Sequence, residues 1–235
     1  MVRADTLFSE EKRRCIAEAI ATAEAQTSAE IVCAVATESG RYDRAEGICG
    51  ILVAVISLGL TNFFVMGDYS GATASGQGVS HSWSDPVGLG LFGQIVAIGL
   101  GYVAGNLLAS YCQPLRRLFV SNREMEDETA RSASRVFLSQ RVRSTRQAGG
   151  VLIYVSLFER RVVVLADDGI MQHDGQAVVE TARDTAIVAL RVGKFVETFV
   201  DAIAGIAGRL QQVLPVEGKN DDELPNELRS FHPRP

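Results

Sequence analysis

The sequence has few of the residues that build metal centres and disulfide frameworks. Its four cysteines are far apart and form no CxxC pair, and its three histidines are scattered, which excludes zinc fingers and histidine-rich metal sites. The net charge of −5 excludes a general nucleic-acid binder that depends on a phosphate-neutralising surface. No GxSxG, Walker or HExxH motif is present, which weighs against the common hydrolase classes.

Two stretches of the chain lack charged side chains altogether. No Asp, Glu, Lys, Arg or His occurs from 47 to 67 or from 86 to 115. Because about 20 apolar residues cross a hydrocarbon core of about 30 Å, each stretch is long enough to span a bilayer. The alternative, a pair of buried core helices, is disfavoured because core helices of this length rarely lack all charge. We expect transmembrane helices at about 47–67 and 87–112, with an outer loop over 68–85.

Basic residues gather on one side of this expected hairpin. The loop 68–85 contains no Lys or Arg. Six arginines flank the other ends of the spans: Arg41, Arg44, Arg116, Arg117, Arg123 and Arg131. The positive-inside rule then places both flanks in the cytoplasm and the loop outside. The first fourteen residues are charged and lack the apolar core of a signal peptide, so we expect the N-terminus to stay in the cytoplasm.

Small residues recur every four positions along the second span. They are Gly93, Ala97, Gly101, Gly105 and Ala109. Such residues let helix backbones approach closely, which is how helices associate in lipid. The alternative is that glycine is simply common in membrane helices. We favour a packing face, used either within the hairpin or between two copies of the chain.

The remainder of the sequence predicts one α/β domain that the hairpin interrupts. Its first part is 1–46 and its second part is 116–214, followed by a polar tail over 215–235. Helical periodicity and β-branched runs predict helices at about 9–26, from 121, 175–190 and from 194, and strands at 30–38, 149–158 and 161–167. The last two strands are separated only by Glu159-Arg160, which is typical of a β-hairpin.

A pair of carboxylates follows the last predicted strand. Asp167 and Asp168 precede Gly169, which frees the backbone for a turn. Carboxylates at a strand end suit Ca²⁺ or Mg²⁺, and we expect the strand to deliver them to the carboxyl end of the sheet. Glu30, at the start of the first strand, is the further ligand we expect. The alternative is a solvated turn in which Asp binds its own backbone.

Several motifs resemble the TPM domain family, which includes photosystem II repair proteins, thylakoid lumen proteins, MOLO proteins and bacterial membrane proteins. The motifs are Thr27-Ser28-x-Glu30, Gly150-Val151-Leu152-Ile153-Tyr154-Val155-Ser156, Ala166-Asp167-Asp168-Gly169-Ile170 and an Asn-Glu-Leu segment at Asn226. The resemblance covers about 9–38 and 121–228. The inserted hairpin departs from the soluble members, and no catalytic set of residues carries over.

The resemblance implies a small central β-sheet with helices on both faces. Some members are accessory subunits of membrane complexes. Together with the predicted hairpin, this leads us to expect a protein of the bacterial inner membrane that acts as a binding, accessory or scaffold factor for a membrane partner. Some members bind Ca²⁺ or related cations at acidic positions near strand ends, which strengthens the Asp167 and Asp168 hypothesis. Weak acid phosphatase activity in plant relatives provides the alternative function, a metal-assisted phosphatase.

Overall fold

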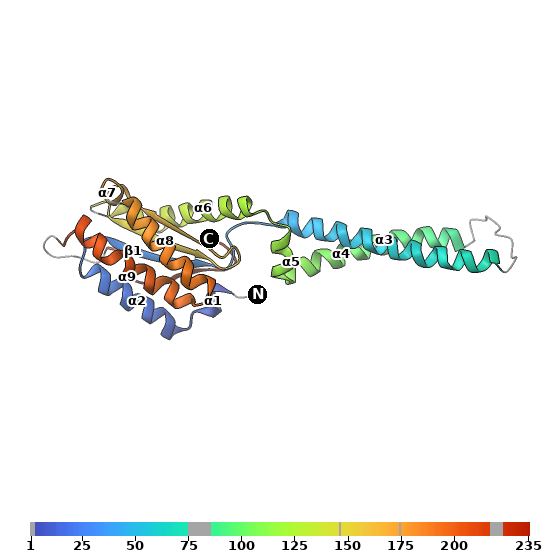
Figure 1. Ribbon diagram of the computed structural model, residues 1–235, viewed down its shortest axis with the longest axis horizontal. Coiled ribbons are helices and arrows are strands. Elements are labelled where there is room, and N and C mark those ends of the chain that lie inside the picture. Colours follow the sequence, from blue (N-terminus) through green and yellow to red (C-terminus); the bar gives the residue numbers. More distant parts are fainter. Residues whose placement is uncertain (1–2, 75–85, 146, 174, 217–222) are drawn as a thin grey trace. The chain divides into compact units, whose positions relative to one another are not determined.

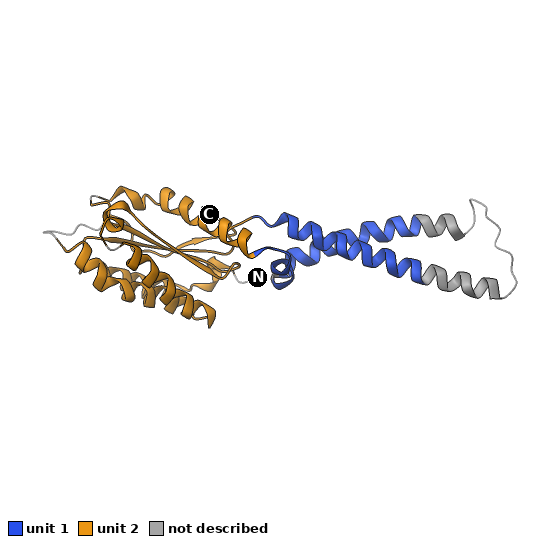
Figure 2. Ribbon diagram, turned by 45° about the horizontal axis from the view of Figure 1, so that its top comes forward, with its two compact units in different colours: residues 1, 41–121 blue, residues 2–40, 122–235 orange. Residues whose placement is uncertain are grey.

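The chain divides into two compact units (Figure 2). The computed structural model describes residues 3–74, 86–145, 147–173, 175–216 and 223–235. We call residues 41–121 the hairpin unit, and residues 2–40 together with 122–235 the sheet unit. The sheet unit is therefore built from chain on both sides of the hairpin unit.

A four-stranded mixed sheet forms the centre of the sheet unit (Figure 1). Its strands are β1 (Glu30–Ala36), β2 (Gly150–Ser156), β3 (Arg161–Ala166) and β4 (Arg229–Phe231), in the order β3-β2-β1-β4. β1 is parallel to β2 and β4, whereas β3 returns antiparallel to β2. Because β1 precedes the hairpin unit and β2 follows it, the sheet forms only when both parts of the chain pair.

Helices flank the sheet on both faces, so the expected mixed α/β fold is confirmed (Figure 1). One face carries α2 (Glu10–Glu24), α8 (Gly175–Arg191) and α9 (Phe195–Val213), and the other carries α6 (Asn122–Ser139) and the short 3₁₀ helix η1 (Val142–Ser144). Successive strand residues alternate between the faces, so Ile153 lies on the first and Leu152 on the second. Two four-residue helices complete the unit, α1 (Ala4–Leu7) and α7 (Asp168–Met171).

The motif Thr27-Ser28-x-Glu30 ties the start of β1 to the end of α9. Thr27 Oγ1 lies 2.6 Å from the carbonyl oxygen of Leu214, and Ser28 Oγ donates to the carbonyl oxygen of Pro215 at 3.0 Å. The last turn of a helix leaves its carbonyl groups without helical partners, and Thr27 supplies one. The first two residues of this motif therefore have a structural role.

The segment predicted as a polar tail contains a strand among its described residues. Its residues Arg229–Phe231 form β4, in which Ser230 pairs with Val35. The Arg13 guanidinium also donates to the Leu228 carbonyl at 3.0 Å and to Ser230 Oγ at 2.8 Å. Three residues are too few to give a recognisable alternation in sequence, so only the pairing with β1 reveals this strand.

The hairpin unit consists of α3 (Asp43–Ala74), α4 (Pro86–Tyr111) and α5 (Gln113–Leu118). Two of its helices are long and apolar enough to cross a membrane, over Asp43–Phe63 and Phe92–Tyr111. α3 continues to Ala74, well into the segment that the sequence assigned to the outer loop, and residues 75–85 of that loop lie outside the described residues.

Small residues form the contact between α3 and α4. A Cβ atom at Gly105 would lie 2.8 Å from the Cys49 carbonyl oxygen, and one at Gly101 would lie 2.5 Å from Ser57 Oγ. Ala109 is fully buried, whereas a Cβ atom at Gly93 would meet open space. The close approach predicted for this face therefore occurs inside the hairpin. Self-association of two copies through the same face stays a prediction.

Candidate functional site

Asp167 and Asp168 lie at a different edge of the sheet from the one predicted. β3 is antiparallel to β2, with Ala166 opposite Val151, so the carboxyl end of β3 meets the amino ends of β2 and β1. We call this the amino edge, and the opposite one, where β1 and β2 end, the carboxyl edge. The expectation that the Asp pair occupies the carboxyl edge is wrong, because the turn between β2 and β3 reverses the strand direction.

Arg143 binds both carboxylates at the amino edge. The side chain of Asp167 is buried, and its Oδ1 accepts the Asp168 N–H at 2.8 Å, which caps α7. Arg143 Nε lies 3.6 Å from the same oxygen, and Arg143 Nη2 lies 2.9 Å from Asp168 Oδ2. Asp167 Oδ2 is buried without a hydrogen-bond partner among the described residues. A guanidinium therefore supplies the positive charge that a cation would bring.

Glu30 lies in the same row of the sheet but is separated from the Asp pair. It is opposite Gly150 of β2, and Gly150 O accepts the Asp167 N–H at 2.8 Å. Two strand spacings across the sheet put the backbones of Glu30 and Asp167 about 10 Å apart. Val142 covers Gly150, where a Cβ atom would overlap the Val142 carbonyl oxygen. The Glu30 carboxylate instead accepts the N–H groups of residues 223 and 224 at 3.4 and 3.2 Å.

The three predicted metal ligands thus share an edge without sharing a site. Among the described residues no group of three or more His, Cys, Asp or Glu side chains has the arrangement of a metal site. Asp167 and Asp168 remain adjacent and hold a guanidinium, so a cation there would compete with Arg143. The Ca²⁺ or Mg²⁺ site stays a prediction.

Replacing Arg143 with alanine provides a test of that prediction. With a dissociation constant of about 10⁻³ M, ~10 mM Mg²⁺ stabilises the native state by about 1.4 kcal/mol, which raises the melting temperature by about 3 °C. We expect this shift in Arg143→Ala and a smaller one in the natural chain, measured by thermal shift. If Mg²⁺ does not change the melting temperature of Arg143→Ala, the metal hypothesis is wrong and Asp167 only caps α7. The same holds if Mg²⁺ shifts the melting temperature of Arg143→Ala/Asp167→Asn by the same amount as that of Arg143→Ala.

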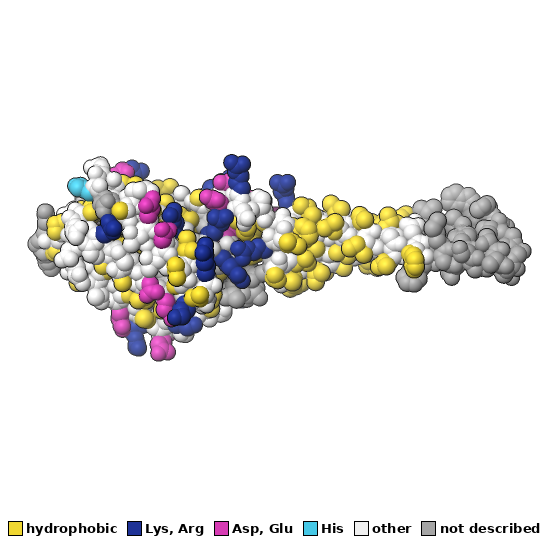
Figure 3. Space-filling view, in the orientation of Figure 1, with side chains coloured by type: hydrophobic (Ala, Val, Ile, Leu, Met, Phe, Trp, Pro, Cys, Tyr) yellow, Lys and Arg dark blue, Asp and Glu magenta, His cyan; other side chains and the backbone are white. Residues whose placement is uncertain are grey.

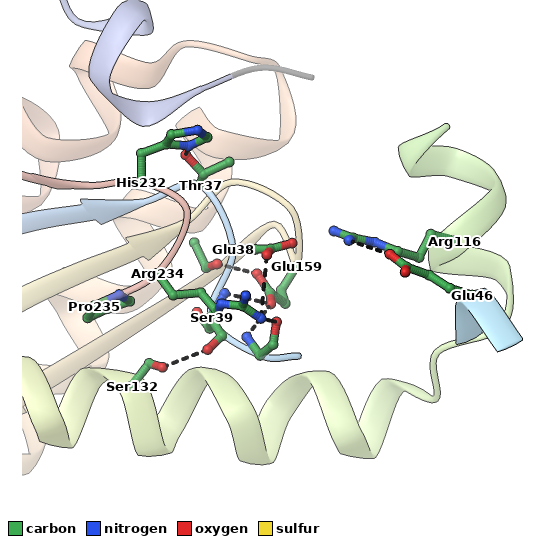
Figure 4. Close-up of polar contacts among 12 residues, drawn as sticks. Thr37, Glu38, Ser39, Glu46, Arg116, Ser132, Glu159, His232, Arg234 and Pro235 are labelled. Atoms are coloured by element: carbon green, nitrogen blue, oxygen red, sulfur yellow. Dashed lines mark hydrogen bonds and ion pairs between the residues drawn. The ribbon is translucent and has the colours of Figure 1, made fainter. Parts of the chain in front are cut away.

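A second polar cluster, which the sequence did not predict, lies at the carboxyl edge (Figure 4). Its side chains come from the residues that follow β1, from the end of β2 and from the turn before β3. They are Thr37, Glu38, Ser39, Ser156 and Glu159, and all five are buried. Parallel strands of open α/β sheets place ligand sites at this edge, so the position is the one expected for a functional site.

Glu159 is the centre of the carboxyl-edge cluster. Its Oε1 accepts the N–H groups of Ser39 at 2.9 Å and Gly40 at 3.3 Å, and its Oε2 accepts the hydroxyl of Ser156 (Figure 4). Ser39 Oγ also forms a 2.9 Å hydrogen bond with the Tyr154 hydroxyl. Burial raises the pKa of the Tyr154 phenol, so it stays protonated at neutral pH. The carboxylate is stabilised by donors that the fold itself positions.

The C-terminal segment covers this cluster. The Arg234 guanidinium lies 3.7 Å from Glu38 Oε1 and donates to the Gly40 carbonyl at 3.4 Å. His232 Nδ1 is 2.9 Å from Thr37 Oγ1, and the Glu38 N–H donates to the Pro233 carbonyl at 3.0 Å (Figure 4). The edge is therefore closed by protein groups.

Sequence reasoning missed this cluster although two signals were present. Glu38 is the last residue of the predicted strand 30–38, and Glu159 lies in the predicted turn between two apolar strands. Either position is unusual because ionised carboxylates are rarely buried without partners. Their partners are backbone N–H groups and a distant arginine, which no local spacing reveals.

The hydrogen bonds of the cluster fix the backbone just before the hairpin unit begins. Gly40 is the last residue of the sheet unit before Arg41, and Ser39 is fixed on three sides by Glu159, Tyr154 and Ser132, whose Oγ donates to the Ser39 carbonyl at 2.9 Å. Both carboxylates already have donors. This arrangement favours a rigid exit point from the sheet over acid–base chemistry.

Comparison with known proteins supplies the fold alone. Neither a protein-family model nor a curated protein matches the chain. Among solved structures, the chain is similar to the NMR structure of the BA42 protein from the psychrophilic bacterium Bizionia argentinensis, with 17% identity and a TM-score of 0.54. The match covers 97% of this chain and 99% of that chain.

Proposed function

We propose that the protein is a TPM-like α/β domain anchored in a bilayer by its inserted hairpin, and that it serves a membrane partner as a binding or accessory factor. The observation that carries the proposal is the distribution of apolar side chains in the hairpin unit. Figure 3 shows hydrophobic side chains along the outside of this unit. Only 17% of the most apolar stretch of each of these two helices is buried.

The exposed side chains are large and lie along both helices. On α3 they are Ile48, Ile51, Leu52, Val55, Ile56, Leu60 and Phe63, and on α4 they include Phe92, Ile95, Val96, Leu100, Val103, Leu107 and Leu108. Gly101, Gly105 and Ala109 lie in the contact between the helices, whereas these large side chains face outward, the reverse of a water-soluble helix pair. A surface of this kind needs an apolar solvent, and each such side chain gains about 1.5–3 kcal/mol on leaving water.

The arginines flanking the hairpin support a bacterial inner-membrane location with both termini in the cytoplasm. A binding role is favoured over turnover because the buried carboxylates of Glu30, Glu38 and Glu159 are already engaged by a guanidinium group, a hydroxyl and backbone N–H groups. The phosphatase alternative stays a prediction, and no contact described above favours it.

Membrane retention tests the anchor. We expect alkaline carbonate to leave the full chain in the membrane pellet, and Val55→Arg/Ile56→Arg to lower retention, since each arginine at a helix centre costs about 2.5–3.5 kcal/mol. The matched control is Val188→Arg/Val192→Arg, which changes equally exposed valines of the sheet unit. Release of the unchanged chain by carbonate would contradict the anchor.

Purification in mild detergent from native membranes tests the binding role. The proposal predicts a defined membrane protein in constant ratio to the full chain, with no turnover of a chromogenic phosphate ester. Ester hydrolysis that requires a divalent cation and is abolished by Asp167→Asn would instead support the phosphatase.

A further inference from the structure

Exposed arginines lie at the end of the hairpin unit where α3 begins. The side chains of Arg41 and Arg44 both face solvent, and neither side chain makes an ion pair or hydrogen bond with the residues that the structure describes. Asp43 between them is also exposed and offsets one of the two charges. Ile48, one turn further along α3, is the first large exposed apolar side chain.

A third arginine at this end is used internally. Arg116 of α5 is buried, lies 3.3 Å from Glu46 Oε1 of α3, and places its guanidinium 5.9 Å from the ring centre of Tyr42. These contacts neutralise Arg116 and hold α5 against the first turn of α3. Two large side chains near this contact are exposed: Tyr111 at the end of α4 is 82% exposed, and Leu118 at the end of α5 is 76% exposed.

The same end of the hairpin therefore presents unpaired cations beside exposed apolar groups. We call Arg41, Arg44, Tyr111 and Leu118 the basal collar. A helix rises 1.5 Å per residue, so Arg44 lies about 6 Å beyond Ile48 along the axis of α3. The polar region on each side of a hydrocarbon core is about 5–7 Å thick, so side chains one turn beyond the apolar surface lie at the depth of lipid headgroups.

We infer that the basal collar binds anionic phospholipid headgroups of the membrane that the hairpin crosses. Arg41 and Arg44 would contact the phosphate groups, and Tyr111 and Leu118 would lie at the boundary with the acyl chains, where amphipathic side chains are stabilised. This inference rests on the proposed membrane anchor and adds the lipid class that the anchor prefers. Arg116 takes no part, because Glu46 already neutralises it.

Lipid selectivity of the reconstituted full chain tests the inference. The measured quantity is the association of spin-labelled phosphatidylglycerol relative to spin-labelled phosphatidylcholine in vesicles that contain both lipids. We expect a preference for phosphatidylglycerol that falls roughly fivefold in Arg44→Gln and further in Arg41→Gln/Arg44→Gln. Raising the salt concentration to about 1 M should weaken the preference of the natural chain in the same direction.

Matched controls separate this inference from the anchor itself. Arg183→Gln/Arg191→Gln removes two exposed arginines of α8 and should leave the preference unchanged. Each variant is also washed with alkaline carbonate. If Arg41→Gln/Arg44→Gln stays in the vesicles and keeps the preference of the natural chain for phosphatidylglycerol, the inference about the basal collar is wrong and the anchor is unaffected. Loss of the unchanged chain from the vesicles would overturn both.

Discussion

Replacing Glu159 with alanine is expected to lower the free energy of unfolding of the sheet unit by about 4 kcal/mol. The change removes an acceptor that serves the N–H groups of Ser39 and Gly40 and the hydroxyl of Ser156. Buried donors left without an acceptor cost about 1–3 kcal/mol each. For a chain of this size the melting temperature should fall by about 10 °C, measured by circular dichroism of the full chain in mild detergent.

Two further variants make the Glu159 result specific. Glu159→Gln keeps one carbonyl oxygen for the N–H groups of Ser39 and Gly40, so we expect about half the loss. Glu126→Ala removes a carboxylate that is 69% exposed and should change stability by no more than about 0.5 kcal/mol. Equal, small effects of Glu159→Ala and Glu126→Ala would contradict the account of the carboxyl edge.

If the hairpin unit is the proposed membrane anchor, replacing residues 41–121 with a flexible linker should yield a soluble protein. The sheet unit has its own hydrophobic core, and all four strands come from outside the deleted segment. A linker of about 12 Gly and Ser residues has an average span of about 20 Å. We expect a soluble product that unfolds in a single cooperative transition, measured by sedimentation and calorimetry.

The same deletion tests whether the two parts of the sheet unit depend on each other. β1 pairs with β2 over seven residues, from Glu30 opposite Gly150 to Ala36 opposite Ser156. A fragment from Ser121 onward lacks β1 and should therefore be unfolded or aggregated, because only the β2–β3 hairpin would remain from the centre of the sheet. If that fragment folds as stably as the linked chain, the sheet unit is not a split domain.

Local patterns in the sequence were sufficient for the long elements. The apolar stripe from Phe195 to Leu214 predicted α9, and the β-branched runs at 30–38, 149–158 and 161–167 predicted β1, β2 and β3. These elements bury one face or both faces against neighbours, so their residues carry a clear period. The predicted turn residues Glu159 and Arg160 lie in the connection between β2 and β3, which is two residues longer than predicted because β2 ends at Ser156, and Arg160 adopts a positive φ of 52° there.

Long-range contacts decided what the sequence could not reveal. β4 exists because three residues near the end of the chain pair with β1, and α5 is held by an ion pair between Arg116 and Glu46, which are 70 positions apart. The edge that receives Asp167 depends on β1 being parallel to β2 while β3 is antiparallel to it, and the parallel pairing of β1 with β2 is a long-range contact. Its partner Arg143 lies in a short 3₁₀ helix that no periodicity marks.

Cysteine labelling in intact cells tests the membrane hairpin most directly. In a chain whose natural cysteines are replaced, one new cysteine is introduced as Ser75→Cys in the predicted outer loop, or as Gln211→Cys on the exposed side of α9. The account predicts that a membrane-impermeant maleimide labels Ser75→Cys in intact cells and labels Gln211→Cys only after lysis. Labelling of both positions to the same extent before lysis, or of Ser75→Cys only after lysis, would contradict it.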